Sequence, residues 1–357
     1  MAFVSLISGF AGSHAGRYGC RATVRGLRSA GVVCMVQASS ESSTRYTKED
    51  QWDGLCRNAG IWEGNQASYD KDGIEKKRVG SSVYIHTSGE REDGKPGPSD
   101  VWVHLLREGS QRYSQVYFSR DNFFARGMFM SPFGDMDSGF RTAVRENGTI
   151  IEQVISMDGE DDKCVGRVRI VHKGARNEEG FSTWIVFRER RSPQALPEYN
   201  SQIPQSREHP VEIRETNNPW DLNTKSEGST FEQLRGSWKG VKHTIGAKDS
   251  TMRKSEYSFD VSYTDGKMDV NYLLHHETET LRLKGERMTD NMIRFSNGGE
   301  LRDLGGGVTV LSPPTIPESG NLVVEMAWVL GNTRKRVVRS YKDGEWVSSG
   351  YSIETRV

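Results

Sequence analysis

The pentapeptide Gly60-Ile61-Trp62-Glu63-Gly64 decides how this chain of 357 residues is organised, because it returns as Gly236-Ser237-Trp238-Lys239-Gly240. Each copy follows a short segment that holds an aromatic residue and a leucine: Trp52 and Leu55 in the first, Phe231 and Leu234 in the second. A repeat at this distance is too long for a solenoid unit and suits a duplicated domain. The sequence therefore predicts two domains built on one plan.

Both halves read as antiparallel β-structure. Hairpin-forming pairs such as Asn147-Gly148 and Asp343-Gly344 separate stretches rich in β-branched and aromatic residues, and no long helical period is present. Evenly spaced strands of this kind predict an up-and-down sheet, and closure into a barrel removes its exposed edges. A single large β-sandwich remains the alternative. The expected strands are 101–106, 114–118, 167–171, 183–188, 257–263, 267–274, 322–330, 336–341 and 346–353.

A short helical turn, a Gly-x-Trp motif and a meander of strands together resemble the calycin superfamily, which includes the lipocalins. The glycine permits a tight bend, and the tryptophan closes one end of the barrel. The resemblance implies a cation from the last strand across each indole. We expect Arg188 in the first barrel and Arg339 or Arg356 in the second. The expected structural plugs are Gly60, Trp62, Gly64 and Arg188, and Gly236, Trp238, Gly240 and Arg339.

These patterns divide the chain into four parts. Residues 1–40 form an expected leader, 41–191 the N-terminal β-barrel, 192–230 a linker and 231–357 the C-terminal β-barrel. The linker holds five of the eleven prolines. The predicted fold is thus all-β, with two tandem antiparallel lipocalin-like barrels that each begin with a short helical turn.

The first 40 residues have the composition of an organellar transit peptide. They contain four arginines and no Asp, Glu or Lys, and they lack the apolar stretch of a secretory signal. We expect import into a plastid with cleavage near Cys34; mitochondrial import and an uncleaved disordered tail are the alternatives. The remaining Cys56 and Cys164 suit a reducing compartment, since two distant cysteines make neither a disulfide framework nor a metal site.

Toward the C-terminus, the sequence resembles one particular family within the calycin superfamily. Gly305-Gly306-Gly307, Ser312-Pro313-Pro314 and the stretch Arg336 to Trp346 follow in the order found in a family of tandem lipocalin-like proteins of cyanobacteria and plastids. In the first half, Phe118-Ser119-Arg120-Asp121 and Ser131-Pro132-Phe133-Gly134 match the same family. The plant member of that family is the biogenesis factor required for chloroplast ATP synthase.

The resemblance implies a non-enzymatic assembly factor of the chloroplast stroma that binds the β and γ subunits of ATP synthase, without a cofactor. One alternative is a carrier of a small hydrophobic ligand such as a bilin, a carotenoid, a fatty acid or haem, because barrels of about eight strands can enclose one ligand. A phycobilin lyase is the third reading, since some of these enzymes are calycins. We expect a monomer.

The residues themselves offer little chemistry. Basic and acidic residues balance at 48 each, which gives no indication of nucleic-acid binding, and no apolar run is long enough to span a membrane. His275-His276 and Glu160-Asp161-Asp162 lack metal-ligand spacing, and no catalytic constellation surrounds either cysteine. A basic stretch with a nearby indole is the candidate partner-binding surface: Arg334, Lys335, Arg336 and Trp346.

Overall fold

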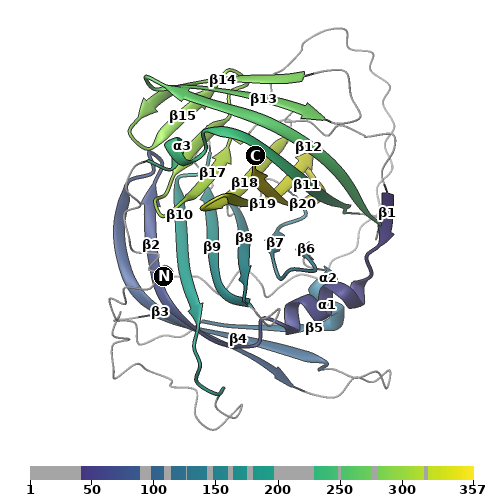
Figure 1. Cartoon of the computed structure of the whole chain (residues 1–357). Helices are drawn as coiled ribbons and strands as arrows, with labels where there is room; N and C mark the ends of the chain where they lie inside the picture. Colours follow the sequence, from purple (N-terminus) through teal and green to yellow (C-terminus); the bar gives the residue numbers. More distant parts are fainter. Residues whose placement is uncertain are drawn as a thin grey trace, which may run out of the picture.

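The computed structural model describes residues 42–88, 98–107, 114–125, 127–142, 148–159, 164–174, 180–196, 229–247, 251–274, 280–316 and 321–357. In this part of the chain, strands account for nearly all regular structure, and the helices are short: α1 (Lys48–Cys56), α2 (Arg120–Ala125) and α3 (Thr230–Gln233). The predicted all-β fold with two tandem barrel-like sheets is confirmed (Figure 1).

The first sheet is a curled half-barrel of nine antiparallel strands, in the order β5-β4-β3-β2-β10-β9-β8-β7-β6. Its two edge strands, β5 and β6, are joined through α2 and do not pair with each other in the described residues. Its strands are β2 (Gly60–Asp70), β3 (Glu75–Ser88), β4 (Asp100–Arg107), β5 (Ser114–Ser119), β6 (Met128–Met130), β7 (Met136–Gly139), β8 (Thr149–Asp158), β9 (Cys164–Gly174) and β10 (Thr183–Arg191).

The second sheet closes completely. Ten consecutive strands, β11 to β20, pair in sequence, with β20 against β11, and the β12–β13 pairing completes the ring. The strands are β11 (Gly236–Gly246), β12 (Thr251–Thr264), β13 (Lys267–Leu274), β14 (Thr280–Thr289), β15 (Met292–Phe295), β16 (Glu300–Asp303), β17 (Val308–Ser312), β18 (Leu322–Leu330), β19 (Thr333–Lys342) and β20 (Glu345–Arg356).

The half-barrel is closed by helices where it lacks strand pairing. Trp52 and Leu55 of α1 and Phe123 of α2 belong to one buried cluster with Trp62 and Val83 of the sheet. Helix α1 begins with a capping box, in which the side chains of Thr47 and Asp50 each accept a hydrogen bond from the other's backbone N–H. The predicted short helical turn before the first Gly-x-Trp motif is therefore a two-turn helix inside the sheet.

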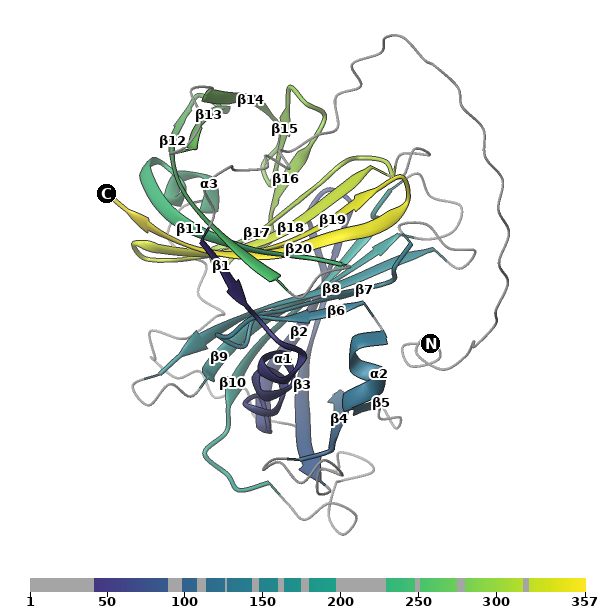
Figure 2. The same ribbon diagram turned by 90° about the vertical axis from the view of Figure 1, so that its right-hand side faces the viewer.

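One short strand belongs to the opposite half from the one expected. Strand β1 (Ser42–Arg45) pairs antiparallel with β12 of the closed barrel, and α1 follows it immediately into the half-barrel. Figure 2 shows β1 and α1 crossing from one half to the other beside the contact between the two sheets. The range 41–191 thus supplies a strand to the second sheet, while residues 197–228 of the expected linker lie outside the described residues.

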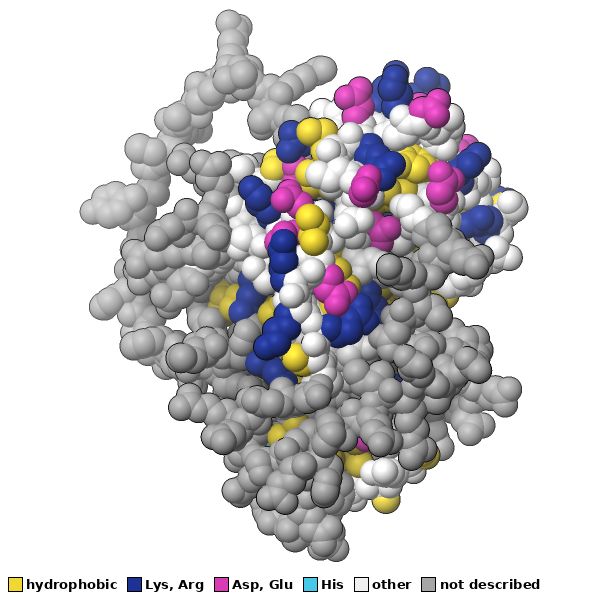
Figure 3. Space-filling model, turned by 90° about the vertical axis from the view of Figure 1, so that its left-hand side faces the viewer, with side chains coloured by type: hydrophobic (Ala, Val, Ile, Leu, Met, Phe, Trp, Pro, Cys, Tyr) yellow, Lys and Arg dark blue, Asp and Glu magenta, His cyan; other side chains and the backbone are white. Residues whose placement is uncertain are grey.

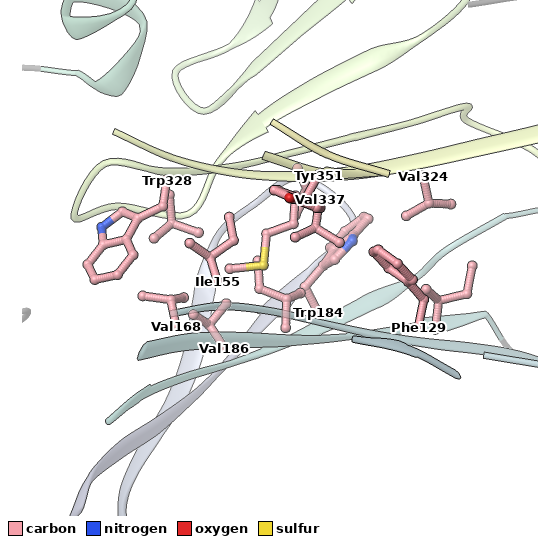
Figure 4. Packing of buried hydrophobic residues seen from close by; sticks show 14 of the residues in the cluster. Phe129, Ile155, Val168, Trp184, Val186, Val324, Trp328, Val337 and Tyr351 are labelled. Atoms are coloured by element: carbon pink, nitrogen blue, oxygen red, sulfur yellow. The ribbon is translucent and has the colours of Figure 1, made fainter. Parts of the chain in front are cut away.

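The largest hydrophobic cluster lies between the halves rather than inside either of them. Figure 4 shows Val168, Trp184 and Val186 of the half-barrel facing Val324 and Trp328 of the closed barrel. Trp184 is fully buried and Trp328 is 1% exposed. We call this contact the seam; it is formed by the outer faces of β8–β10 and β17–β20.

Trp328→Ala tests whether the seam couples the two halves. A buried large-to-small change of this kind costs about 3–5 kcal/mol. Because the cluster belongs to both sheets, we expect one cooperative urea-unfolding transition in far-UV circular dichroism, shifted to lower urea. The control is Met288→Ala, at an exposed position of β14, which should change the unfolding free energy by about 0.5 kcal/mol or less. Two separate transitions, only one of them shifted, would contradict the coupling.

Candidate functional site

The two Gly-x-Trp motifs fold in the same way. Gly60 and Gly236 have positive φ angles of 149° and 115°, which let the chain turn from the preceding helical segment into a strand. Trp62 Nε1 donates a hydrogen bond to Asn58 O at 2.9 Å, and Trp238 Nε1 donates to Leu234 O, four residues earlier, at the same distance. Both indoles are fully buried inside their own sheets.

The glycines that follow the tryptophans allow a close approach of neighbouring strands. A Cβ atom added at Gly64 would lie 1.9 Å from Arg188 O, and one at Gly240 would lie 2.7 Å from Glu354 Cγ. Any larger side chain would force the first pair of strands apart. These positions therefore shape the sheet wall next to each indole.

Neither Arg188 nor Arg339 lies over a Gly-x-Trp indole; other arginines do. In the closed barrel, the Arg356 guanidinium lies 4.8 Å from the Trp238 ring centroid. In the half-barrel, Arg167 lies over Trp62 at 4.2 Å and Arg191 at 5.8 Å. Each guanidinium can interact favourably with the face of its ring.

The expectations for Arg188 and Arg339 are corrected by strand geometry. Successive side chains of a strand point to opposite faces, and both residues point away from the barrel interiors into the seam. Arg188 Nη2 donates to the carbonyl oxygens of Leu304 and Gly305 in the other half, at 2.8 and 2.9 Å. Arg339 lies 4.5 Å from the ring centroid of Trp346.

Each interior holds a cluster of two glutamates and two arginines, all of them buried except the half-buried Glu152. In the half-barrel, Glu189 accepts from Arg167 Nε at 2.6 Å and pairs with Arg169 at 3.3 Å, and Arg169 also pairs with Glu152 at 3.1 Å. Burial raises the pKa of Glu189, but Arg167 and Arg169 outweigh that effect and hold the pKa below its usual range. The carboxylate is therefore ionised and fully committed to these arginines.

The closed barrel repeats this arrangement. Arg336 pairs with Glu354 at 3.0 Å and with Glu325, while Arg334 pairs with the same two carboxylates at 3.3 and 3.2 Å. Burial raises the pKa of Glu325, but Arg336 and Arg334 more than offset it. The corresponding positions in the two halves are Glu152 and Glu325, Arg167 and Arg334, Arg169 and Arg336, Glu189 and Glu354, and Arg191 and Arg356.

This second repeat was present in the sequence but was missed there. An Arg-x-Arg pair on the penultimate strand of each half faces a Glu-x-Arg pair on the last strand, in the register Arg167↔Glu189 and Arg334↔Glu354. The sequence gives no sign that these residues face an interior, because charged residues in a strand usually lie on a solvated face.

The prediction of a basic partner-binding surface on strand β19 is wrong, because this charged strand does not face solvent. Arg334 and Arg336 point into the closed barrel, whereas Lys335 points into the seam and donates to Ser156 O at 2.7 Å. Trp346 is 9% exposed and donates from Nε1 to Ser349 Oγ. This part of strand β19 is buried on both faces, so its basic side chains pair with groups inside the protein.

A polar network holds the middle of the seam. Asp137 and Arg339 form an ion pair at 2.7 Å with both side chains fully buried, and Ser349 also donates to Asp137. Gln153 Nε2 donates to Val324 O and Val337 O at 3.3 Å across the seam. Because each of these groups needs its partner in the other half, the network fixes how the two sheets lie against each other.

Two histidines and one cysteine of the described part are held in their neutral forms by burial. Burial lowers the pKa of His172 to about 3 and that of His104 to about 4, and it raises the pKa of the Cys164 thiol. Such groups stay neutral and are poor acids, bases or nucleophiles near neutral pH. Among the described residues, no three His, Cys, Asp or Glu side chains are placed to hold a metal ion, and no helix could cross a bilayer.

The described residues do not include the pair His275-His276 or the acidic run Glu160-Asp161-Asp162. On the face drawn in Figure 3, Lys and Arg side chains lie interspersed with Asp and Glu over the upper part, which is the closed barrel. Exposed large hydrophobic side chains in the described part are few; Phe133 is 41% exposed and Ile74 is 49% exposed.

Comparison with known proteins supports the resemblance for the C-terminal half. Residues 225–357 match the family model described as "Biogenesis factor required for ATP synthase 1, C-terminal domain". A comparison with curated proteins found no match.

A crystal structure of a protein of unknown function from the DUF3598 family of Nostoc punctiforme is similar over both halves. The TM-score is 0.67 at 18% sequence identity, over 86% of this chain and 99% of that chain, which shows a shared fold. The S-type phycobiliprotein lyase of Guillardia theta covers 37% of this chain and 94% of its own, at 15% identity and a TM-score of 0.28. That likeness is too low to carry an argument.

The buried ion pair of the seam gives the first test of the site. Arg339→Met should lower the unfolding free energy by about 3–5 kcal/mol, because it leaves the Asp137 carboxylate buried and uncompensated. The double variant with Asp137→Leu should recover most of that loss in urea denaturation. The matched control is Arg78→Met in the half-exposed Arg78–Glu75 pair, which should cost about 1 kcal/mol or less. An equal loss in single and double variants would show that the pair has no special role.

Asp135 gives the second test, through pH. It is 2% exposed and accepts hydrogen bonds from Ser156 N and Ser131 Oγ, and burial raises its pKa to about 6 from an ordinary 3.8. A raised folded-state pKa means that stability is greatest with the carboxyl protonated and is lost as the pH rises from about 4 through about 6. The loss should reach about 3 kcal/mol, at 1.36 kcal/mol for each pKa unit.

Denaturant titrations of wild type and Asp135→Asn between these pH values measure this effect. The wild type should lose stability relative to the variant as the pH rises. A constant difference between the two proteins across this range would contradict the assignment.

Proposed function

We propose that this chain is a non-enzymatic assembly factor in the biogenesis of ATP synthase. The observation that carries the proposal is the match of residues 225–357 to the family model for such a factor. The buried chemistry is compatible with this role, because the charged residues of each barrel pair with one another and leave no acid, base or nucleophile poised for catalysis in the described part.

The finer proposal concerns partners and place. We infer that the chain works in the chloroplast stroma and binds the β and γ subunits of the catalytic head. The composition of residues 1–40 motivates the location, and the family resemblance motivates the subunits. A factor of this kind needs a surface of fixed shape. The seam joins the two sheets into a single packed unit, so the outer surfaces of both halves keep one arrangement.

The exposed aromatic Phe133 is the docking anchor that this structure favours. It lies in the turn between β6 and β7, which is held by hydrogen bonds from Ser131 N to Asp135 O at 2.7 Å and from Asp135 N to Ser131 Oγ at 3.0 Å. Its ring packs edge-on against Tyr351 of the closed barrel, with centroids 5.6 Å apart. A rigidly held, exposed aromatic ring beside the junction of two domains has the properties of an interface hot spot.

Affinity purification of the tagged full chain from plant cells tests this function. We expect recovery of the chain from isolated stroma, with the β and γ subunits of ATP synthase among the copurified proteins. Purified β and γ subunits should then bind the chain separately in a direct assay. Recovery from another compartment, or no binding of either purified subunit, would refute the finer proposal.

The variant Phe133→Ser tests the docking anchor within the same assay. Loss of a hot-spot aromatic costs about 2 kcal/mol or more, which weakens binding about thirtyfold. The matched control is Ile74→Ser, a similarly exposed apolar residue at the β2–β3 turn, which should leave binding unchanged. If Ile74→Ser weakens binding and Phe133→Ser does not, the anchor is misplaced while the assembly role stands.

A further inference from the structure

The two edge strands of the half-barrel, β5 and β6, are treated differently by the rest of the described chain. Strand β6 is three residues long, and helix α1 packs beside it. Met130 N donates to Gln51 Oε1 at 3.4 Å, and the Tyr46 hydroxyl donates to Met130 O at 2.7 Å. Side chains from the N-terminal segment thus bind the main-chain groups of Met130 at this edge.

Strand β5 has an open edge. It lies at the margin of the half-barrel next to α2 (Figure 2). In an antiparallel pair, the main-chain groups of alternate residues point toward the neighbouring strand and away from it. Ser119 N donates to Asn122 Oδ1 at 3.0 Å, so Ser119 belongs to the set that points away from β4. Gln115 and Tyr117 share this direction, and in the described residues neither makes a main-chain hydrogen bond on that side.

The sequence of β5 lacks the usual protection of an open edge. Such edges normally carry charges, a proline or a bulge. Strand β5 reads Ser-Gln-Val-Tyr-Phe-Ser, without a charge or a proline, and its register with β4 is unbroken. Strand β12 has a comparable edge from Thr251 to Lys254, outside its pairing with β13, and β1 pairs with it there. The fold therefore already covers one such edge with an added strand.

The side chains of β5 indicate what kind of strand fits. Tyr117 is 36% exposed; its ring centroid lies 4.4 Å from that of Trp102, and its hydroxyl donates to Asp100 Oδ1 at 2.5 Å. On the opposite face, Val116 and Phe118 pack with the buried cluster of the half-barrel interior. Both faces are apolar or aromatic, and the favourable cross-strand neighbours of such residues are β-branched or aromatic.

The size of the edge favours a flexible segment over a second copy of this chain. Strand β5 has six residues, which span about 20 Å. A folded partner that met this edge alone would bury less than the about 1,200 Å² of a stable interface. An extended segment instead gains affinity from main-chain hydrogen bonds and specificity from alternate side chains. Because β5 carries no charge, a segment without charges matches it best.

We propose that β5 binds an extended, uncharged segment of a client protein, which adds to the half-barrel as a further strand. The N–H groups of Gln115 and Tyr117 donate to its carbonyl oxygens, and their own carbonyl oxygens accept from its N–H groups. The identity of the client rests on the proposed function: it is an unassembled β or γ subunit of ATP synthase. Pairing over so few residues is reversible, as the release of a client requires.

Hydrogen exchange of the full chain, followed by NMR with and without short overlapping peptides from the β and γ subunits, tests the pairing. We expect at least one peptide to slow exchange of the Gln115 and Tyr117 amides about tenfold or more, because they become hydrogen-bonded. The amides of Val116 and Phe118 point toward β4 and serve as the internal control, since their exchange should not change. Binding without protection of Gln115 and Tyr117 would overturn the proposal.

Two variants at one position separate main-chain pairing from side-chain contacts. Gln115→Pro removes an outward N–H, which an edge strand tolerates, and should weaken peptide binding about tenfold, the worth of one hydrogen bond. The matched control Gln115→Thr keeps the N–H and should bind as the wild type does. Equal affinities of these two variants would contradict strand addition.

A change in the peptide decides the question if circular dichroism shows that Gln115→Pro does not fold. N-methylation of alternate peptide residues in one of the two possible frames should abolish binding, and methylation in the other frame should not. Equal effects of both frames would overturn the proposal. If the intact subunits bind and no peptide does, strand addition at β5 is wrong while the assembly role stands; if a peptide binds and the intact subunits do not, the reverse holds.

Discussion

The rest of the structure depends on one constraint: the central strands of both sheets are buried on both faces. A strand presents alternate side chains to opposite sides, and here one side faces a barrel interior and the other faces the seam. Strands β9, β10, β19 and β20 have no solvated face along much of their length. The charged residues on the buried stretches of these strands must therefore find partners inside the protein.

The protein meets this requirement with two kinds of ion cluster. Inside each sheet, glutamates and arginines form a compact group beside the indole that closes the barrel. In the seam, Asp137 and Arg339 pair across the two halves, and Arg188 is held by backbone carbonyl groups. Burial of ions costs desolvation energy, so these groups are better viewed as fixing one arrangement of the halves than as a large source of stability.

Duplication also allowed the two halves to diverge. In the closed barrel, the Tyr257 hydroxyl donates to Glu354 of the ion cluster, whereas the half-barrel has Ser81 at the corresponding register position. The half-barrel also leaves β5 and β6 unpaired with each other in the described residues and fills that side with α1 and α2. One framework thus closes by strand pairing in one half and by two short helices in the other.

By itself the sequence determined the all-β class, the two Gly-x-Trp motifs and the duplication, because local glycine geometry and turn-forming pairs act over a few residues. It also contained the repeated Arg-x-Arg and Glu-x-Arg pairs, although a charged strand gives no sign of whether its face is solvated. Only the tertiary structure decided that Arg188 and Arg339 face the seam, that Arg356 covers Trp238, and that Arg334 and Arg336 are interior. Those outcomes depend on which outer faces of the two sheets pack together, and that contact joins residues more than a hundred positions apart.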